Sequence, residues 1–482
     1  MNQKKKIYQK ELTRSDDNIR LCDSTGRVFI YQGRVYRGIY PKRLEFIRRL
    51  FERGVVERLI DSKLLIPTRL SNVEIEGFEL VLEHDKIDVL TDPTEWSLVT
   101  YLEGAKTFID LFTELYRNNL MLGDGHPWNI SMAPGGRTIW HDFGSVRSVF
   151  EAENGVARAI NEFLETFYFP LRLYARTGEY NILHRLQMQC SRDEYLRITH
   201  PHLARLMRRT AVHRSHSTLA RVVNKACRLA LCGSVDSSSL IQSVIDTVRS
   251  CVLGRTQRRP DVLRLLGWLR DQISRIPIES PDASVSENYR ENTSLNFKNE
   301  IPWWQHQILT LVQDFRPNRV LVIESQQCGF SVAALGYCNC VVSLDHNVRR
   351  ASKRALLLRE RNNADRIYPL ACDVMFADVE SRERLRSHTV VALSLTHQLR
   401  LQQGYSWRSI AKKLAGLSEK YLITDFMPNG LGQMEAKPSP LPFDYTLETF
   451  LEVLGDHFHK VKVINRLMGD GETPRTIVLC EK

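Results

Sequence analysis

The sequence predicts a two-domain protein, with an α+β domain toward the N-terminus and an α/β domain toward the C-terminus. In the second half, four short runs of Val, Ile and Leu alternate with segments of helical character, which is typical of a parallel sheet with crossover connections. In the first half, residues 27–40 alternate apolar and polar side chains around Gln32 and Gly33, which predicts a β-hairpin. Residues 276–299 are rich in Ser, Pro, Asn and Glu, and we expect a linker there.

The composition is that of an ordinary globular protein. Of 482 residues, 43% are hydrophobic and 26% are charged, enough for two or three domains with their own cores. The net charge of +11 favours an anionic partner such as a nucleotide or a phosphorylated glycan, although basic residues on solvated helix faces explain it equally well. No nucleic-acid-binding module is indicated, and the sequence carries no signal for an oligomeric state.

Cysteine usage and the lack of long apolar runs bear on localisation. The 10 cysteines have irregular spacings that fit no zinc site. No apolar run reaches the length of a membrane span, and no signal-peptide pattern follows the basic N-terminal residues. We therefore expect a cytoplasmic protein with reduced cysteines.

The N-terminal domain is predicted to span residues 18–275, with a small β lobe at 18–100 and a helical lobe at 101–275. After the hairpin, apolar residues recur with helical spacing over 41–61. In the helical lobe, apolar residues share one face over 105–119, and the pattern remains helical over 154–275. Further short strands are predicted at 63–67, 73–75 and 78–83.

Two stretches of this domain carry candidate chemistry, 122–130 (LGDGHPWNI) and 138–144 (TIWHDFG). Phosphoryl transfer requires an acid that orients the acceptor hydroxyl and oxygen ligands that hold magnesium against the phosphates. Asp124 is the candidate catalytic acid, and Asn129 and Asp142 are the candidate metal ligands. The alternative is that the two acids only stabilise their loops.

These stretches resemble the catalytic and metal-binding loops of protein-kinase-like phosphotransferases, and His126-Pro127 before Asn129 is closer to small-molecule and sugar kinases. The resemblance covers about 28–174 and implies ATP and Mg²⁺ as cofactors. Two departures weaken it. No G-x-G-x-x-G loop is present, and the lysine of the third strand is replaced by Arg37, which keeps the charge but holds phosphate with a different geometry.

The C-terminal domain is predicted to span residues 300–482. Its first four strands are expected at 319–324, 340–344, 367–371 and 389–395. Ligands of such sheets bind at the carboxyl ends of the strands. Asp345 directly follows the second strand, where an acid can accept hydrogen bonds from two ribose hydroxyls; the alternative is a helix N-cap. Asp373 follows the third strand and can face an adenine amino group; the alternative is an ordinary loop acid.

This domain resembles class I S-adenosylmethionine-dependent methyltransferases. Residues 420–425 (KYLITD) match the fifth strand, and residues 461–467 and 475–480, joined by MGDGETP, match the closing β-hairpin of that fold. Residues 389–399 and 444–450 resemble a bacterial subgroup that includes rhizobial nodulation methyltransferase-like proteins. The resemblance implies a Rossmann-like seven-stranded sheet, S-adenosylmethionine as cofactor, and a small molecule or glycan as methyl acceptor. A kinase-like region ahead of the catalytic domain in this subgroup favours an accessory role for the N-terminal domain.

The resemblance also implies roles for individual residues. Asp345 and Asp373 would bind the ribose and the adenine, and His397, just past the fourth strand, would take a proton from the acceptor. For His397 the alternative is a hydrogen-bonded histidine at a strand end. The methionine side of the cofactor would face the loop that contains Ser325, Gln327 and Gly329.

One motif departs from the family pattern. The acid that ends the family's first strand is replaced by Val322, and its glycine positions hold Glu324, Gln326 and Cys328. Glycines at those positions allow close approach of the backbone to the cofactor. Either the loop binds the cofactor in a different shape, or the domain has a methyltransferase fold that no longer methylates. A non-catalytic protein in which both sites have decayed is a further alternative.

Overall fold

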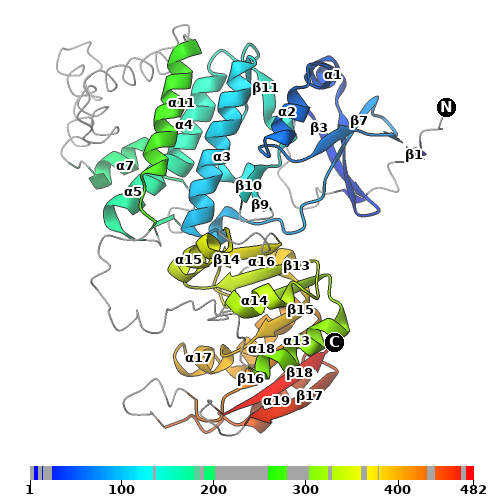
Figure 1. The fold of residues 1–482 in the computed structure, drawn as a ribbon, viewed down its shortest axis with the longest axis vertical. Coiled ribbons are helices and arrows are strands. Elements are labelled where there is room, and N and C mark those ends of the chain that lie inside the picture. Colours follow the sequence, from blue (N-terminus) through cyan, green and yellow to red (C-terminus); the bar gives the residue numbers. More distant parts are fainter. Residues whose placement is uncertain are drawn as a thin grey trace. The chain divides into compact units, whose positions relative to one another are not determined.

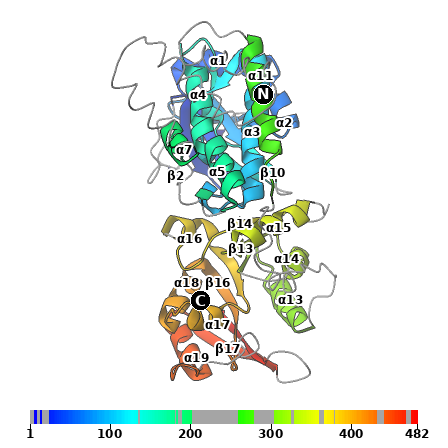
Figure 2. The same cartoon turned by 90° about the vertical axis from the view of Figure 1, so that its left-hand side faces the viewer.

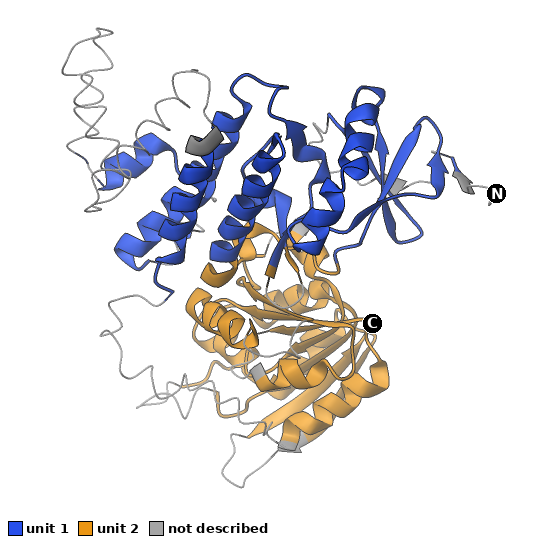
Figure 3. Cartoon of the chain, turned by 45° about the horizontal axis from the view of Figure 1, so that its top comes forward, with its two compact units in different colours: residues 1–87, 101–131, 138–281 blue, residues 88–100, 132–137, 282–482 orange. Residues whose placement is uncertain are grey.

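The computed structural model describes the chain in segments. They are residues 5–8, 13–14, 24–133, 137–179, 182–183, 189–199, 201, 259–278, 303–323, 328–359, 366–377, 379–430, 440–467 and 474–482. The predicted linker lies outside the described residues from 279 to its end at 299. The chain divides into two compact units (Figure 3). Unit 1 comprises Met1–Ile87, Tyr101–Ser131 and Thr138–Pro281, and unit 2 comprises Asp88–Thr100, Met132–Arg137 and Asp282–Lys482.

Unit 1 contains a five-stranded antiparallel sheet with the strand order β2-β3-β4-β7-β5. The strands are β2 (Thr13–Arg14), β3 (Gly26–Tyr31), β4 (Arg34–Ile39), β5 (Thr68–Leu70) and β7 (Leu80–His84); β1 (Lys5–Ile7) and β6 (Val73–Ile75) form a separate parallel pair. The predicted hairpin is confirmed as β3 and β4, which turn at Gln32 and Gly33, both with positive φ. Residues 41–61 form two helices, α1 (Leu44–Glu52) and α2 (Val55–Asp61), because Gly54 adopts a left-handed conformation between them.

The helices of unit 1 include α3 (Leu98–Arg117), which belongs to this unit from Tyr101 onward. The others are α4 (Gly155–Phe163), α5 (Phe169–Thr177), α7 (Arg192–Thr199) and α11 (Arg259–Ser274), and a π-helical turn, Leu164–Tyr168, joins α4 to α5. α11 lies alongside α3 (Figure 1), where Arg270 Nη2 donates to Asp110 Oδ2 at 2.9 Å. Short strand pairs are β8 (Leu120–Leu122) with β11 (Val146–Ser148) and β9 (Ile130–Ala133) with β10 (Arg137–Trp140). Within the described ranges, no helix has both the length and the apolar character needed to cross a membrane.

Unit 2 is a seven-stranded sheet with the order β14-β13-β12-β15-β16-β18-β17. The strands are β12 (Arg319–Ile323), β13 (Cys340–Asp345), β14 (Ile367–Ala371), β15 (Ser387–Ala392), β16 (Ser418–Phe426), β17 (Lys460–Leu467) and β18 (Arg475–Glu481). Strands β12 to β16 run parallel to one another, and β18 is antiparallel to both of its neighbours, β16 and β17. The predicted seven-stranded sheet with its closing antiparallel hairpin is therefore confirmed, whereas the kinase-like fold of the N-terminal domain stays a prediction.

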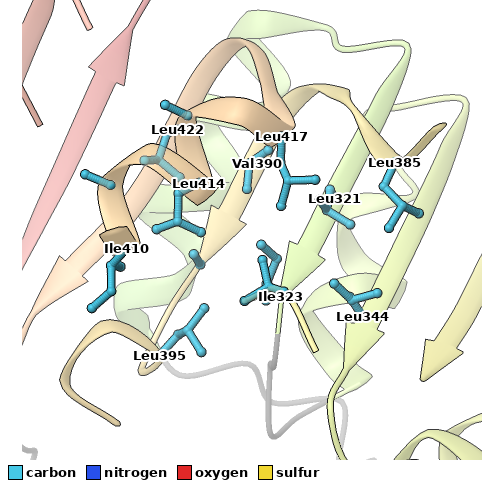
Figure 4. Close-up of a cluster of buried hydrophobic side chains, with 14 of the residues drawn as sticks. Leu321, Ile323, Leu344, Leu385, Val390, Leu395, Ile410, Leu414, Leu417 and Leu422 are labelled. Carbon is cyan, nitrogen blue, oxygen red and sulfur yellow. The ribbon is translucent and has the colours of Figure 1, made fainter. Parts of the chain in front are cut away.

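Both faces of this sheet are covered by helices, which explains why its strands are continuous apolar runs. Figure 2 shows the two helix layers on either side of the sheet. On β12, Leu321 and Ile323 enter one hydrophobic cluster (Figure 4), whereas Val320 and Val322 enter a second cluster on the opposite face. The first cluster includes residues of α16 (Val379–Leu385), α17 (Thr396–Leu401), α18 (Trp407–Leu417) and α19 (Leu447–Gly455); the second includes residues of α13 (Trp303–Phe315), α14 (Cys328–Ala334) and α15 (Val348–Arg359).

Residues 88–100 are grouped with unit 2, although the sequence prediction placed them in the small β lobe. Trp96 forms an antiparallel bridge with the edge strand β14. Arg384 of α16 donates from Nη1 and Nη2 to the two carboxylate oxygens of Glu95, both at 2.9 Å, and Val89 lies in the first hydrophobic cluster. An exposed edge strand offers unpaired backbone groups to other chains, and this segment covers part of that edge.

Candidate active site

The carboxyl ends of the parallel strands of unit 2 bring together several of the residues predicted for the methyltransferase site. Asp345 is the last residue of β13, and Asp373 follows two residues after the end of β14. His397 lies in the first turn of α17, after β15. Because β18 is antiparallel, Arg475 at its start lies at the same edge of the sheet, next to the end of β16. The topology therefore brings together side chains that lie far apart in the sequence.

The Asp345 carboxylate is held by two arginines of α15. Its side chain is 1% exposed. Arg350 donates from Nη2 to Oδ1 at 2.9 Å and from Nε to Oδ2 at 3.0 Å, and Arg354 donates from Nη2 to Oδ2 at 3.2 Å. The backbone N–H of Asn347 also donates to Oδ1, at 2.8 Å. A carboxylate offers about four lone-pair sites, so the protein's own donors occupy them.

The alternative role of Asp345 as a helix N-cap is not what the structure shows. The residue before α15 is Asn347, whose side-chain oxygen accepts from the backbone N–H of Arg350 at 3.1 Å. Asn347 therefore caps α15. Asp345 lies two residues earlier, where it binds two arginines of the helix that follows.

Four other residues were predicted to bind S-adenosylmethionine, and the structure describes two of them. Ser325 and Gln327 lie outside the described residues. Gly329 lies in the first turn of α14, and no described atom lies within 4 Å of the position that a Cβ would take. Asp373 is half-buried, and its Oδ1 accepts from the backbone N–H of Met375 at 2.8 Å, as in the loop-acid alternative. Among the described residues, none would block a ligand that approaches the backbone at Gly329.

His397 is buried and only partly satisfied. It is 3% exposed, and its Nδ1 has no hydrogen-bond partner among the described residues. The pKa of His397 is lowered to about 4, mainly by burial and to a smaller extent by the nearby positive charge of Arg475. The imidazole is therefore neutral at pH 7. Buried polar atoms are rarely left without partners, so Nδ1 has the capacity for one further hydrogen bond.

Beside His397 lies an ion pair between Asp425, at the end of β16, and Arg475. Arg475 Nη1 donates to Asp425 Oδ2 at 3.1 Å, and Ser394 N donates to Asp425 Oδ1 at 2.8 Å. The guanidinium lies 4.0 Å from the ring centroid of Trp304. Burial raises the pKa of Asp425 to about 6 despite the opposing effect of Arg475. Asp425 ends the segment that matches the fifth strand, and the sequence analysis missed Arg475, because its place opposite the end of β16 follows only from the strand order.

Unfolding of the protein at mild acid is expected to depend on His397. The unfolded state takes up the proton near pH 6.5 and the folded state only near 4, so the stability due to the neutral imidazole is complete above pH 6.5 and is lost as the pH falls toward 4. Between pH 7 and pH 5, the His397→Gln variant should lose about 2 kcal/mol less stability than the wild type. Urea denaturation at the two pH values measures this difference. Equal losses would show that His397 is not held neutral by the fold.

The predicted phosphotransfer residues of unit 1 lie on two adjoining loops. Arg37 Nη2 donates to Asp142 Oδ1 at 3.3 Å, and the same oxygen accepts from Gly144 N at 3.0 Å. The backbone N–H of His141 donates to the carbonyl oxygen of Asn129 at 2.9 Å, which places the two predicted metal ligands on neighbouring segments. The side-chain Nδ2 of Asn129 has no hydrogen-bond partner in the part of the chain that is described.

The loop that carries Asp124 is anchored to α4. Gly125 N donates to Glu162 Oε2 at 2.6 Å. A Cβ at Gly125 would lie 2.2 Å from the carbonyl oxygen of Ala159, so this position requires glycine. In the described ranges, no three His, Cys, Asp or Glu side chains group as metal ligands would, so a metal here would depend on Asn129 and Asp142 together with a ligand's phosphates.

Comparison with known proteins gives only partial likenesses. No protein-family model and no curated protein matches the chain. Among solved structures, N-methyltransferase NodS from Bradyrhizobium japonicum WM9 is 9% identical over 37% of this chain and 96% of its own, with a TM-score of 0.27. Magnesium protoporphyrin IX methyltransferase from Synechocystis PCC 6803, with bound S-adenosylhomocysteine, is 12% identical over 42% and 97%, with a TM-score of 0.30. The O-methyltransferase from Bacillus cereus is 15% identical over 42% and 94%, with a TM-score of 0.29.

Proposed function

We propose that the chain is an S-adenosylmethionine-dependent methyltransferase that acts on an oxygen or nitrogen atom of a small molecule or glycan. The observation that carries this proposal is the buried, neutral His397 with its unsatisfied Nδ1, at the carboxyl edge of a sheet with the strand order β14-β13-β12-β15-β16-β18-β17. Unit 1 is proposed to be an accessory kinase-like domain.

The residues present fit the cofactor in part. Asp345 ends the second strand, as a ribose-binding acid would, and no described residue blocks the backbone at Gly329, but the Asp345 carboxylate is already occupied by Arg350 and Arg354. Binding therefore requires one of the arginines to release it. Asp373 would bind the adenine, and Ser325, Gln327 and Gly329 would face the methionine side.

When bound, S-adenosylmethionine supplies an electrophilic methyl group. The chain's own task is then to bind the acceptor and take its proton. A neutral imidazole accepts the hydrogen bond of an acceptor hydroxyl, and the unsatisfied Nδ1 of His397 provides that capacity. Arg475 helps to keep the imidazole neutral, since its positive charge lowers the pKa of His397. The ion pair of Arg475 with Asp425 fixes Ser394, which precedes α17 by one turn residue.

A second candidate function is an ATP- and Mg²⁺-dependent phosphotransferase acting on a small molecule or sugar. The observation that favours it is the bond between Arg37 and Asp142, residues 105 positions apart. Asp124 would orient the acceptor hydroxyl, Asn129 and Asp142 would hold the metal, and Arg37 would bind phosphate. Because Arg37 is already bonded to Asp142, we favour an accessory role for this unit. The occupied Asp345 and the replaced glycine motif support a third reading, a non-catalytic protein.

Calorimetric titration of the full-length protein separates these functions. Binding of S-adenosylhomocysteine with a micromolar Kd, without equally tight binding of ATP and Mg²⁺, is the expected result and supports the methyltransferase. Binding of ATP that requires Mg²⁺, with no binding of S-adenosylhomocysteine, would favour the phosphotransferase. If neither ligand binds at millimolar concentration, the chain is non-catalytic and both enzymatic proposals fail.

A further inference from the structure

The Asp345 carboxylate accepts a pair of hydrogen bonds from one arginine and single hydrogen bonds from two other donors. Arg350 presents two neighbouring N–H groups, Nε and Nη2, to the two carboxylate oxygens at 3.0 and 2.9 Å. This is the parallel, two-bond arrangement in which a guanidinium binds a carboxylate most strongly. Arg354 and the backbone N–H of Asn347 contribute one further bond each to Oδ2 and Oδ1.

The two arginines differ in their freedom to move. The Arg354 side chain is 1% exposed and also donates from Nη1 to Ser343 Oγ on β13 at 2.9 Å, so it is fixed between the helix and the sheet. The Arg350 side chain is 28% exposed. A long side chain at the protein surface can rotate its head group into water at low cost, whereas a buried one cannot. If Asp345 releases an arginine, it is Arg350.

We propose that Arg350 occupies on Asp345 the place of the cofactor's ribose, and that the cofactor binds by exchanging with it. This inference rests on the proposed methyltransferase function. A ribose offers two adjacent O–H donors, the same number that Arg350 now supplies. After the exchange, Arg354 and the Asn347 N–H still hold the carboxylate, so the buried charge stays compensated. Arg350 thereby lowers the affinity for the cofactor and favours ligands whose diol competes well.

The test is calorimetric titration of full-length wild type, Arg350→Ala and Arg350→Met with S-adenosylhomocysteine. Arg350→Met removes the donors and keeps an apolar stem of similar length, which guards against a packing defect in the alanine variant. Both variants should bind about fivefold or more tightly than the wild type. Arg349→Ala is the matched control, because Arg349 is the exposed neighbour on the same helix, and its removal should change the Kd by less than about twofold.

A second ligand separates ribose exchange from a general charge effect. For the 2′,3′-dideoxy analogue of S-adenosylhomocysteine, which lacks the diol, Arg350→Ala should give no gain in affinity. Unchanged or weaker binding of the parent ligand to both Arg350 variants would overturn the proposal while leaving the methyltransferase function intact. An equal gain for the dideoxy analogue, or for Arg349→Ala, would overturn it as well. If no variant and no wild type binds, both the proposed function and this proposal fail.

Discussion

Replacing Asp345 with alanine is expected to lower the free energy of opening of the β13–α15 region by about 3–5 kcal/mol, because a buried charge would lose its counter-charge. The Arg354 guanidinium is 1% exposed and bonds to the carboxylate at 3.2 Å. Without the carboxylate, that buried cation would lose its ion pair with Asp345, and a neutral contact such as the one with Ser343 Oγ does not compensate its charge. Hydrogen–deuterium exchange of peptides covering β13 and α15 measures the local free energy of opening.

Two variants control this prediction. Asp345→Asn keeps the shape and one acceptor oxygen, so its loss of stability should be smaller than that of the alanine variant. Asp456→Ala breaks the exposed pair with Arg408 at 3.7 Å and should cost less than about 1 kcal/mol. Unchanged exchange in Asp345→Ala would show that the arginines bind solvent as readily as they bind Asp345.

The size of this effect bears on how cofactor binding is tested. Loss of S-adenosylhomocysteine binding in Asp345→Ala would follow equally from a missing ribose contact and from a disordered α15. Asp345→Asn, with native-like exchange, is therefore the informative variant for the ribose contact. Arg350→Ala tests the same contact by an expected gain in affinity for S-adenosylhomocysteine. A damaged site would not bind the ligand more tightly, so such a gain cannot result from disorder of α15.

The strands of unit 2 could be predicted from the sequence because burial on both faces leaves a continuous apolar run. The run at 389–395 nevertheless ends as a strand at Ala392. Ser394 has a positive φ of 55°, and its N–H donates to Asp425, so the chain turns before the apolar run is over. Apolar character alone does not show where a backbone group finds a side-chain acceptor from another strand.

The arginines around Asp345 had a local signal that could have been found. Arg350 and Arg354 are four residues apart and therefore lie on one face of the helix that follows the acid. The contacts of Arg475 with Asp425, and of Arg384 with Glu95, had no such signal, because their partners are 50 and 289 residues apart. Long-range pairs of this kind depend on the strand order and on which segment covers a sheet edge. Hydrophobic periodicity predicts neither of these.

A fragment that begins at residue 300, the predicted domain boundary, is expected not to fold as a stable unit. It lacks residues 88–100 and with them three kinds of contact. Val89 fills part of the first hydrophobic cluster, Trp96 bridges to β14, and Glu95 holds Arg384 with two bonds at 2.9 Å. Losing the ion pair of Arg384 costs about 1 kcal/mol, because removing the segment also opens the guanidinium to water, and losing Val89 from the core costs about 1.5–3 kcal/mol. Together these losses take a large share of the net stability of a typical domain, about 5–15 kcal/mol, and the exposed β14 edge adds a tendency to associate.

Circular dichroism and size-exclusion chromatography of the fragment 300–482 test this prediction, and a matched fusion serves as control. Residues 88–100 joined ahead of residue 300 by a long Gly/Ser linker should restore a cooperative thermal transition, whereas the same fusion with Glu95→Ala should restore it only in part. A fragment 300–482 that is monomeric and melts cooperatively at the temperature of the fusion would contradict the prediction. An uncovered edge strand favours association with other chains. A monomeric, cooperatively folded fragment would therefore mean that β14 does not need residues 88–100 along its edge.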